Sequence, residues 1–168
     1  MEADNSKDKE LSLSHVDESG RANMVDVSQK NDTERMARAR SKVLLGREIL
    51  ALLEEGEIQM KKGPVFQTAR LAGIMGAKKT SELIPLCHPL PIHSIKIDIF
   101  VENKEEVIID TRVKTVGKTG VEMEALAGAT IAALTVYDMC KAVSHDIIIQ
   151  ETQLIEKTGG KKDFKRDN

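Results

Sequence analysis

Aromatic residues are scarce in this chain of 168 residues, which has three phenylalanines, one tyrosine and no tryptophan. Any core must therefore come mainly from aliphatic side chains, and a hydrophobic content of 40% at this length predicts one folded domain. The scarcity also leaves few rings on which unpaired bases could stack, as recognition of single-stranded nucleic acid requires.

An excess of charge of either sign is also absent, because 25 basic and 27 acidic residues leave a formal net charge of −2. We therefore expect no nucleic-acid partner, since such proteins present a broad basic surface. No apolar run approaches the roughly eighteen residues of a membrane span. Residues 1–15 contain no apolar signal segment, so we expect no association with a membrane.

Cysteine is limited to Cys87 and Cys140, which form neither a CxxC motif nor a disulfide framework. This usage is typical of a reduced, cytoplasmic protein. No second cluster of cysteine and histidine has the spacing of a zinc site, so we expect no metal. The histidines are scattered along the chain: His15, His88, His93 and His145.

Hydrophobic periodicity predicts an α+β fold. The expected elements are a strand over 36–45, helices over 46–56 and 61–80, a β-hairpin over 94–116, a helix over 121–143 and a strand over 147–157. This order is that of a ferredoxin-like β-α-β-β-α-β sandwich, with an antiparallel sheet and helices packed on one face.

The same pattern divides the chain into three parts. Residues 1–20 are polar and lack periodicity, which predicts a disordered N-terminal tail. Residues 21–157 are expected to form the single α+β domain. Residues 158–168 (TGGKKDFKRDN) are expected to form a flexible, Gly/Lys-rich C-terminal tail.

Three prolines surround a Cys-His pair in LIPLCHPLPI, residues 83–92. Proline fixes its own φ and pushes the preceding residue out of the helical region, so Ile84, His88 and Leu90 are held extended. The stretch is either a rigid packed connection or a segment that aims His88 at a ligand. Composition alone favours a structural histidine.

GKTG, residues 117–120, matches a phosphate loop only in part, because the first glycine of a Walker A motif would fall at Arg112. A turn between a strand and a helix is the favoured interpretation, although Lys118 and the helix-terminal amides could bind an anion.

Lysines that flank the helix over 61–80 either form a solvated face or bind phosphates. These are Lys61, Lys62, Lys78 and Lys79.

Asp138 and Lys141 lie three residues apart on the helix over 121–143 and therefore share a face. One interpretation is a surface ion pair that contributes little to stability. The other is a partly desolvated pair suited to proton transfer, because the helix around them is apolar. Glu122 and Glu124 open the same helix, where acidic side chains also favour the helix dipole. The residues alone leave these alternatives open.

Several long motifs, in one order, resemble those of the MoaC family of cyclic pyranopterin monophosphate synthases. They are MVDVSQK, KKGPVFQTARLAGIMGAKKT, LIPLCHPL, GKTGVEMEAL, ALTVYDMCKAV and TGGKKDF, and the resemblance covers residues 14–165. It implies a cytoplasmic lyase of molybdenum cofactor biosynthesis that converts 3′,8-cyclo-7,8-dihydro-GTP to cyclic pyranopterin monophosphate with release of pyrophosphate. It also implies a ferredoxin-like fold and a homo-hexamer, a trimer of dimers with the active site at the dimer interface.

The resemblance transfers roles to particular positions. It assigns catalysis to Asp138, Lys141 and Lys62, and substrate binding to Leu86, Cys87, His88, Met123, Glu124 and Lys78. The tail departs from the expected Gly-Asp-Phe, because it reads GGKKDF, which leaves the register of its lysines open. No cofactor is required by the sequence. Pyrophosphate chemistry is compatible with Mg²⁺, but no carboxylate cage for that ion is evident.

Two other functions compete with this lyase. A noncatalytic ferredoxin-like module that binds nucleotide or RNA would carry stacking aromatics on its hairpin strands, where only Phe100 occurs. An inactive structural subunit of the same family would have lost site residues. Those residues are intact here: Asp138, Lys141, His88 and Lys62.

Helix geometry separately predicts a site shared between two chains. Glu124 and Asp138 are fourteen residues apart. At ~1.5 Å per residue they are about 21 Å apart along the axis, too far for one compact ring system to touch both. Two such helices, antiparallel across a two-fold axis, would bring the start of one to the end of the other. Small residues are expected to permit that approach: Ala125, Ala127, Gly128, Ala129, Ala132 and Ala133.

Overall fold

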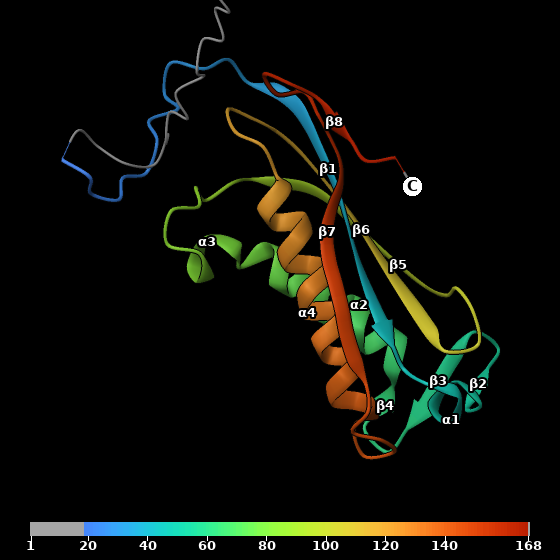
Figure 1. Cartoon of the computed structure of the whole chain (residues 1–168). Coiled ribbons are helices and arrows are strands. Elements are labelled where there is room, and N and C mark those ends of the chain that lie inside the picture. Colours follow the sequence, from blue (N-terminus) through green and yellow to red (C-terminus); the bar gives the residue numbers. More distant parts are fainter. Residues whose placement is uncertain (1–18, 168) are drawn as a thin grey trace, which may run out of the picture.

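The computed structural model describes residues 19–167, which form a sheet covered by helices on one face (Figure 1). The predicted disordered tail over residues 1–20 therefore lies almost wholly outside the described residues. The main sheet has five strands in the order β5-β6-β1-β7-β8, and every pairing is antiparallel. The strands are β1 (Thr33–Leu44), β5 (Ile92–Val101), β6 (Glu106–Gly117), β7 (Ile148–Thr158) and β8 (Phe164–Lys165).

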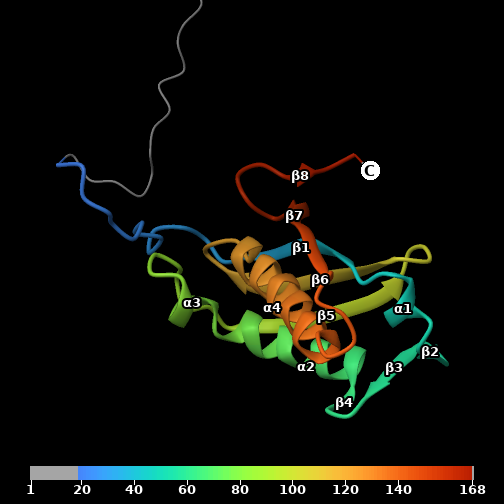
Figure 2. The same ribbon diagram turned by 60° about the horizontal axis from the view of Figure 1, so that its bottom comes forward.

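Both long helices cover the same face of this sheet: α2 (Val65–Lys78) and α4 (Glu122–Cys140). Figure 2 shows them side by side under the strands. Apart from the short segments between β1 and β5 and the terminal β8, the order is strand, helix, strand, strand, helix, strand. The predicted ferredoxin-like α+β sandwich is therefore confirmed. No helix in the described range has the length and apolar character needed to cross a membrane.

The segment between β1 and α2 differs from its prediction. We expected a helix over 46–56, but α1 (Arg47–Leu50) ends after one turn. A small sheet follows, made of β2 (Leu53–Glu54), β3 (Glu57–Met60) and β4 (Gly63–Pro64). Glu55 and Gly56 adopt φ values of 49° and 81°, and this left-handed turn reverses the chain where the helix was expected to continue.

The residues of β1 explain why the sheet has one buried and one open face. Ala37 and Ala39 are fully buried under the helices, as the alternation predicts. On the opposite face, Arg38 and Arg40 both donate to the Asp110 carboxylate on β6, with a shortest contact of 2.6 Å. Burial alone would raise the pKa of Asp110, but the two guanidinium groups outweigh it and lower that pKa.

Small residues let α2 and α4 pack closely. A side chain at Gly73 would place its Cβ 2.7 Å from the carbonyl oxygen of Gly128, closer than real Cβ atoms come to any such atom. This packing corrects one expectation, because most of the small residues expected to face a second chain are instead buried within this one: Ala125, Gly128, Ala129, Ala132 and Ala133. The exposed residues of α4 are larger, and they include Met123, Thr130 and Leu134.

After β7 the chain turns back to form β8. Gly159 makes the turn with a φ of 81°, at a place where a Cβ would collide with the main chain of Glu34. The Asp163 carboxylate accepts the N–H of Gly159 at 3.1 Å and so closes the turn around Lys161. The flexibility expected for residues 158–168 stays a prediction.

Candidate active site

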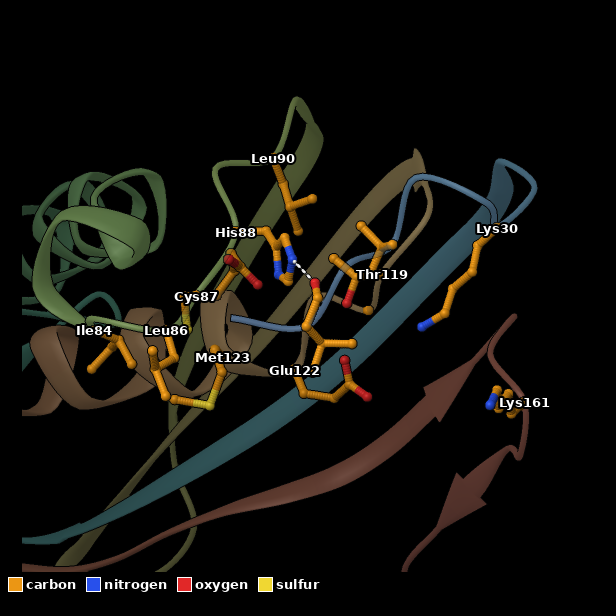
Figure 3. Close-up of a pocket in the computed structure, with 14 residues that line it drawn as sticks. Lys30, Ile84, Leu86, Cys87, His88, Leu90, Thr119, Glu122, Met123 and Lys161 are labelled. Atoms are coloured by element: carbon orange, nitrogen blue, oxygen red, sulfur yellow. Dashed lines mark hydrogen bonds between the residues drawn. The ribbon is translucent and has the colours of Figure 1, made fainter. Parts of the chain in front are cut away.

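A pocket of about 670 Å³ opens where α4 begins (Figure 3), within the range of small-molecule sites. Its walls come from residues 25–30, the loop over 84–90, the turn over 119–124 and Lys161. Most of the residues that the resemblance assigns to substrate binding line it together: Leu86, Cys87, His88, Met123 and Glu124.

The proline-rich loop after α3 (Thr80–Leu83) shapes one wall of this pocket. Ile84 is extended, with a φ of −111° and a ψ of 110°, as its position before proline predicts. His88 is half-buried, and its Nε2–H donates to the carbonyl oxygen of Val25 at 2.7 Å. The loop is therefore a packed connection, and contact of His88 with a ligand stays a prediction. It holds the N-terminal segment, and it brings the His88 ring to the pocket wall (Figure 3).

Glu124 and Cys87 both line this pocket, and both have raised pKa values. Only 4% of Glu124 is exposed, and burial raises the pKa of its carboxyl group. Burial, followed by the charge of Glu124, raises the pKa of the Cys87 thiol. Glu124 is thus able to carry a proton closer to neutral pH than an ordinary glutamate, whereas Cys87 stays a neutral thiol and not a nucleophilic thiolate.

A second cluster of predicted site residues lies at the other end of α4. The Asp138 carboxylate contacts Lys141 Nζ at 2.7 Å and Lys62 Nζ at 2.7 Å, through different oxygens. Lys62 also donates to the main-chain carbonyl of Asp138 at 3.2 Å. Lys141 and then Lys62 lower the pKa of Asp138 to about 2, and Asp138 raises the pKa of Lys141. The structure thus gathers the three residues predicted to be catalytic.

These two groups of residues do not meet within one chain. Glu124 lies in the first turn of α4 and Asp138 in its last, and the helix has 19 residues. Their separation along the axis is therefore about 21 Å. Figure 1 shows α3 and the loop after it near one end of α4, and β4 near the other. Lys78 lies in neither group, because it borders a separate hollow of about 420 Å³ with His93 and Ile95.

A basic hollow of about 220 Å³ adjoins the pocket. Five cationic residues line it: Lys30, Arg35, Lys118, Lys157 and Lys161. Lys30 and Lys161 border the pocket as well, so the two spaces are adjacent. The sequence indicated only some of these cationic residues, namely Lys118 in GKTG and the lysines of the tail. The others are too far apart along the chain for any spacing rule to group them.

Neighbouring groups hold some of these cations in place. Arg35 donates to the main-chain carbonyls of Gly117 at 3.1 Å and Lys118 at 3.3 Å, and so supports the GKTG loop. Lys157 pairs with Glu122 at 3.0 Å. Among the residues that the structure describes, Glu122 is the only acidic one lining the hollow, so positive charge is in excess there. An anion such as a phosphate would therefore be favoured.

The described residues offer no ligand set for a metal ion, because no group of three or more His, Cys, Asp or Glu side chains converges among them.

Comparisons with known proteins give relatives over nearly the whole chain. A family model described as "MoaC family" matches residues 24–160. "Molybdenum cofactor biosynthesis protein 1" of Drosophila melanogaster is 49% identical over 156 residues, which cover 92% of this chain but only 27% of that protein. This chain thus spans about a quarter of the length of the Drosophila protein.

Two bacterial relatives match along most of their own length. "Cyclic pyranopterin monophosphate synthase" of Heliobacterium modesticaldum is 51% identical over 150 residues, covering 89% of this chain and 93% of the relative. The protein of the same name from Peptoclostridium acidaminophilum is 48% identical over 159 residues, covering 94% of this chain and 99% of the relative.

Proposed function

The chain belongs to the MoaC family, and from this premise we propose that it is a cyclic pyranopterin monophosphate synthase of molybdenum cofactor biosynthesis. In this lyase reaction, 3′,8-cyclo-7,8-dihydro-GTP is rearranged to a pyranopterin that carries a cyclic phosphate, and pyrophosphate leaves. One observation carries the proposal from the structure. The pocket at the start of α4 adjoins a basic hollow and shares lining residues with it, so the pocket suits the fused rings of the substrate and the hollow suits its phosphates.

The phosphates are proposed to lie in the basic hollow. Lys30 and Lys161 border both spaces, where they would contact a phosphate chain that runs from one space to the other. Closure of the cyclic phosphate is an attack by a substrate hydroxyl on the α-phosphorus with pyrophosphate as the leaving group. Such a step depends mainly on positioning and on stabilising charge on the leaving oxygens, which lysines and arginine supply.

The proton transfers are proposed to use groups at both ends of α4. Lys141 and Lys62 both pair with the Asp138 carboxylate, so their ammonium groups suit stabilisation of negative charge and donation of a proton. The buried Glu124, with its raised pKa, suits a carboxyl group that exchanges a proton with the ring system. His88, tied to Val25 through Nε2, is proposed to orient the bound rings.

The active site is proposed to be shared by two chains, because one chain cannot bring its two groups together. The outward face of α4 is partly apolar, with Leu134 53% exposed, and Leu71 and Met75 of α2 are 61% and 53% exposed. We propose that this face pairs with its copy across a two-fold axis, with the α4 helices antiparallel, so that Glu124 of one chain approaches Asp138 of the other. Three such dimers would form the hexamer.

Two further expectations belong to this proposal. Mg²⁺, where it takes part, would enter with the phosphates, since the described residues form no resident cage for it. The protein would act in the cytoplasm, where its two cysteines stay reduced.

The test is to incubate the purified protein with 3′,8-cyclo-7,8-dihydro-GTP and to measure pyrophosphate and the cyclic phosphate product. The proposal predicts stoichiometric formation of both, lost in Lys62→Ala and retained in Lys104→Ala, a change at an exposed lysine in the β5–β6 turn. A noncatalytic nucleotide-binding module would bind the compound without pyrophosphate release. An inactive subunit of the family would also release none, and either result would refute the proposal.

A further inference from the structure

The helix α2 begins without a capping side chain of its own. Pro64 occupies the N-cap position and no acidic residue lies in the first turn, so the first N–H groups of the helix need acceptors from elsewhere. Glu57, on β3, supplies them. Its Oε1 accepts the N–H of Phe66 at 2.7 Å and its Oε2 accepts that of Gln67 at 3.0 Å. A carboxylate at this position is also favoured by the helix dipole.

The same carboxylate lies at the base of the hairpin that carries Lys62. β3 and β4 pair through Gln59 with Pro64 and Met60 with Gly63, so Lys61 and Lys62 form its tip. Glu57 Oε1 also accepts the N–H of Ile58 at 2.9 Å. Glu57 therefore joins β3 to the start of α2, which directly follows β4 in the chain.

The end of α4 lies close to this junction. The Cys140 thiol, in the last turn of α4, is affected first by burial and then by the charge of Glu57, which together raise its pKa to about 11. Lys62 reaches across to the same turn, with Nζ 2.7 Å from Oδ2 of Asp138. Within this short hairpin, Glu57 is therefore bonded to the start of α2, and Lys62 at the tip contacts the end of α4.

We propose that Glu57 is a positioning residue that holds the β3–β4 hairpin so that Lys62 engages Asp138. The inference rests on the proposed function only in giving Lys62 a catalytic role. Helix α2 has other support, because Val65, Phe66 and Ala69 are buried in the core. The tip of the hairpin is exposed and has only two pairs of strand residues to hold it. Loss of the Glu57 contacts should therefore displace Lys62 more than it unfolds the helix.

The variant Glu57→Gln tests this, because its amide keeps the shape but replaces one accepting oxygen with a donor. We expect the pKa of Asp138, followed by carboxyl NMR, to rise from about 2 toward its ordinary 3.8, as it should in Lys62→Ala. We also expect kcat to fall at least ~10-fold while KM changes little. Glu54→Gln is the matched control, since Glu54 is exposed and pairs with Glu57 across the small sheet.

An unchanged Asp138 titration in folded Glu57→Gln would overturn the proposal, whatever happens to turnover. If Glu57→Gln does not fold, Glu57→Asp retains the charge but draws the oxygens back from the amides. The same rise in the pKa of Asp138 is expected there, and its absence would again overturn the proposal. The titration of Asp138 needs no substrate. If the wild-type protein showed no turnover, the proposed function would be refuted, but the titration would still test the role of Glu57.

Discussion

Asp138 illustrates how individual residues acquire their properties from contacts that the sequence only partly specifies. Lys141 was expected beside it from helical spacing, and the ion pair of 2.7 Å agrees with that expectation. Lys62 joins from a hairpin 76 positions earlier, which no local pattern could place. With both lysines present, the Asp138 carboxylate stays ionised above about pH 2, and it raises the pKa of Lys141. Proton transfer at this cluster would therefore come from the lysines.

Replacement of Lys141 by alanine should lower turnover by at least ~100-fold while the protein stays folded, because it removes a charge and a proton donor. The comparison is with Lys104→Ala, measured as kcat with circular dichroism as the check on folding. Lys141→Arg should fail as well if the proton itself is transferred, since arginine stays protonated. Near-normal turnover in a folded Lys141→Ala protein would exclude the role.

His88→Ala should reduce activity more than stability. The lost hydrogen bond to the carbonyl of Val25 is half-buried, and such a bond contributes about 0.5–1.5 kcal/mol to the free energy of unfolding. We expect a modest fall in Tm but a large fall in kcat/KM. His93→Ala is the control, since His93 is exposed and lies outside the pocket. A collapse in Tm without a separable loss of activity would instead mark His88 as a structural histidine.

At the scale of elements, the sheet carries a charged cluster away from the active site. Arg38 and Arg40 on β1 converge on Asp110 of β6, a side chain that is only 9% exposed. Because the pKa of Asp110 is lowered in the folded state, its contribution to stability is present above its ordinary pKa of 3.8 and is lost as the pH falls through the lowered value.

We therefore expect Asp110→Asn to lose about 1–3 kcal/mol of unfolding free energy at pH 7, because two arginines lose their charged partner. Its stability should also depend less on pH than that of the wild type below about pH 4. Asp98→Asn, at the exposed neighbouring position on β5, is the control. Urea unfolding at several pH values makes the measurement, and parallel pH dependence in all three proteins would contradict this account.

Strands and long helices could be predicted from the sequence because their periodicity is strong. Alternation over β1, β5 and β6 identified the sheet, and small residues at helical spacing identified the packed face of α2. The segment over 46–56 could not be predicted, because its leucines fit a helix while Glu55 and Gly56 adopt left-handed φ values. The small residues of α4 were predicted to be tightly packed, but spacing could not tell that their partner is α2 and not a second chain.

At the scale of the whole molecule, the candidate site is divided between the two ends of α4. The resemblance supplied the residues of both groups, and helix geometry supplied their separation. Neither the resemblance nor helix geometry predicted the basic hollow. Its cations come from positions as distant as Lys30 and Lys157 and converge only in the folded chain. The division is the reason to propose a dimer as the unit that acts.

The most direct test mixes two inactive proteins, Glu124→Ala and Asp138→Ala, under conditions that allow chains to exchange. In a shared site, each mixed dimer has one site with both residues intact, so random exchange should restore about a quarter of wild-type pyrophosphate release. A mixture of Glu124→Ala with His88→Ala should restore none, because both changes fall in the same pocket. Co-purification of differently tagged chains shows that exchange has occurred. If the first mixture then recovers no activity, each chain contains its whole site, and the proposed shared site is contradicted.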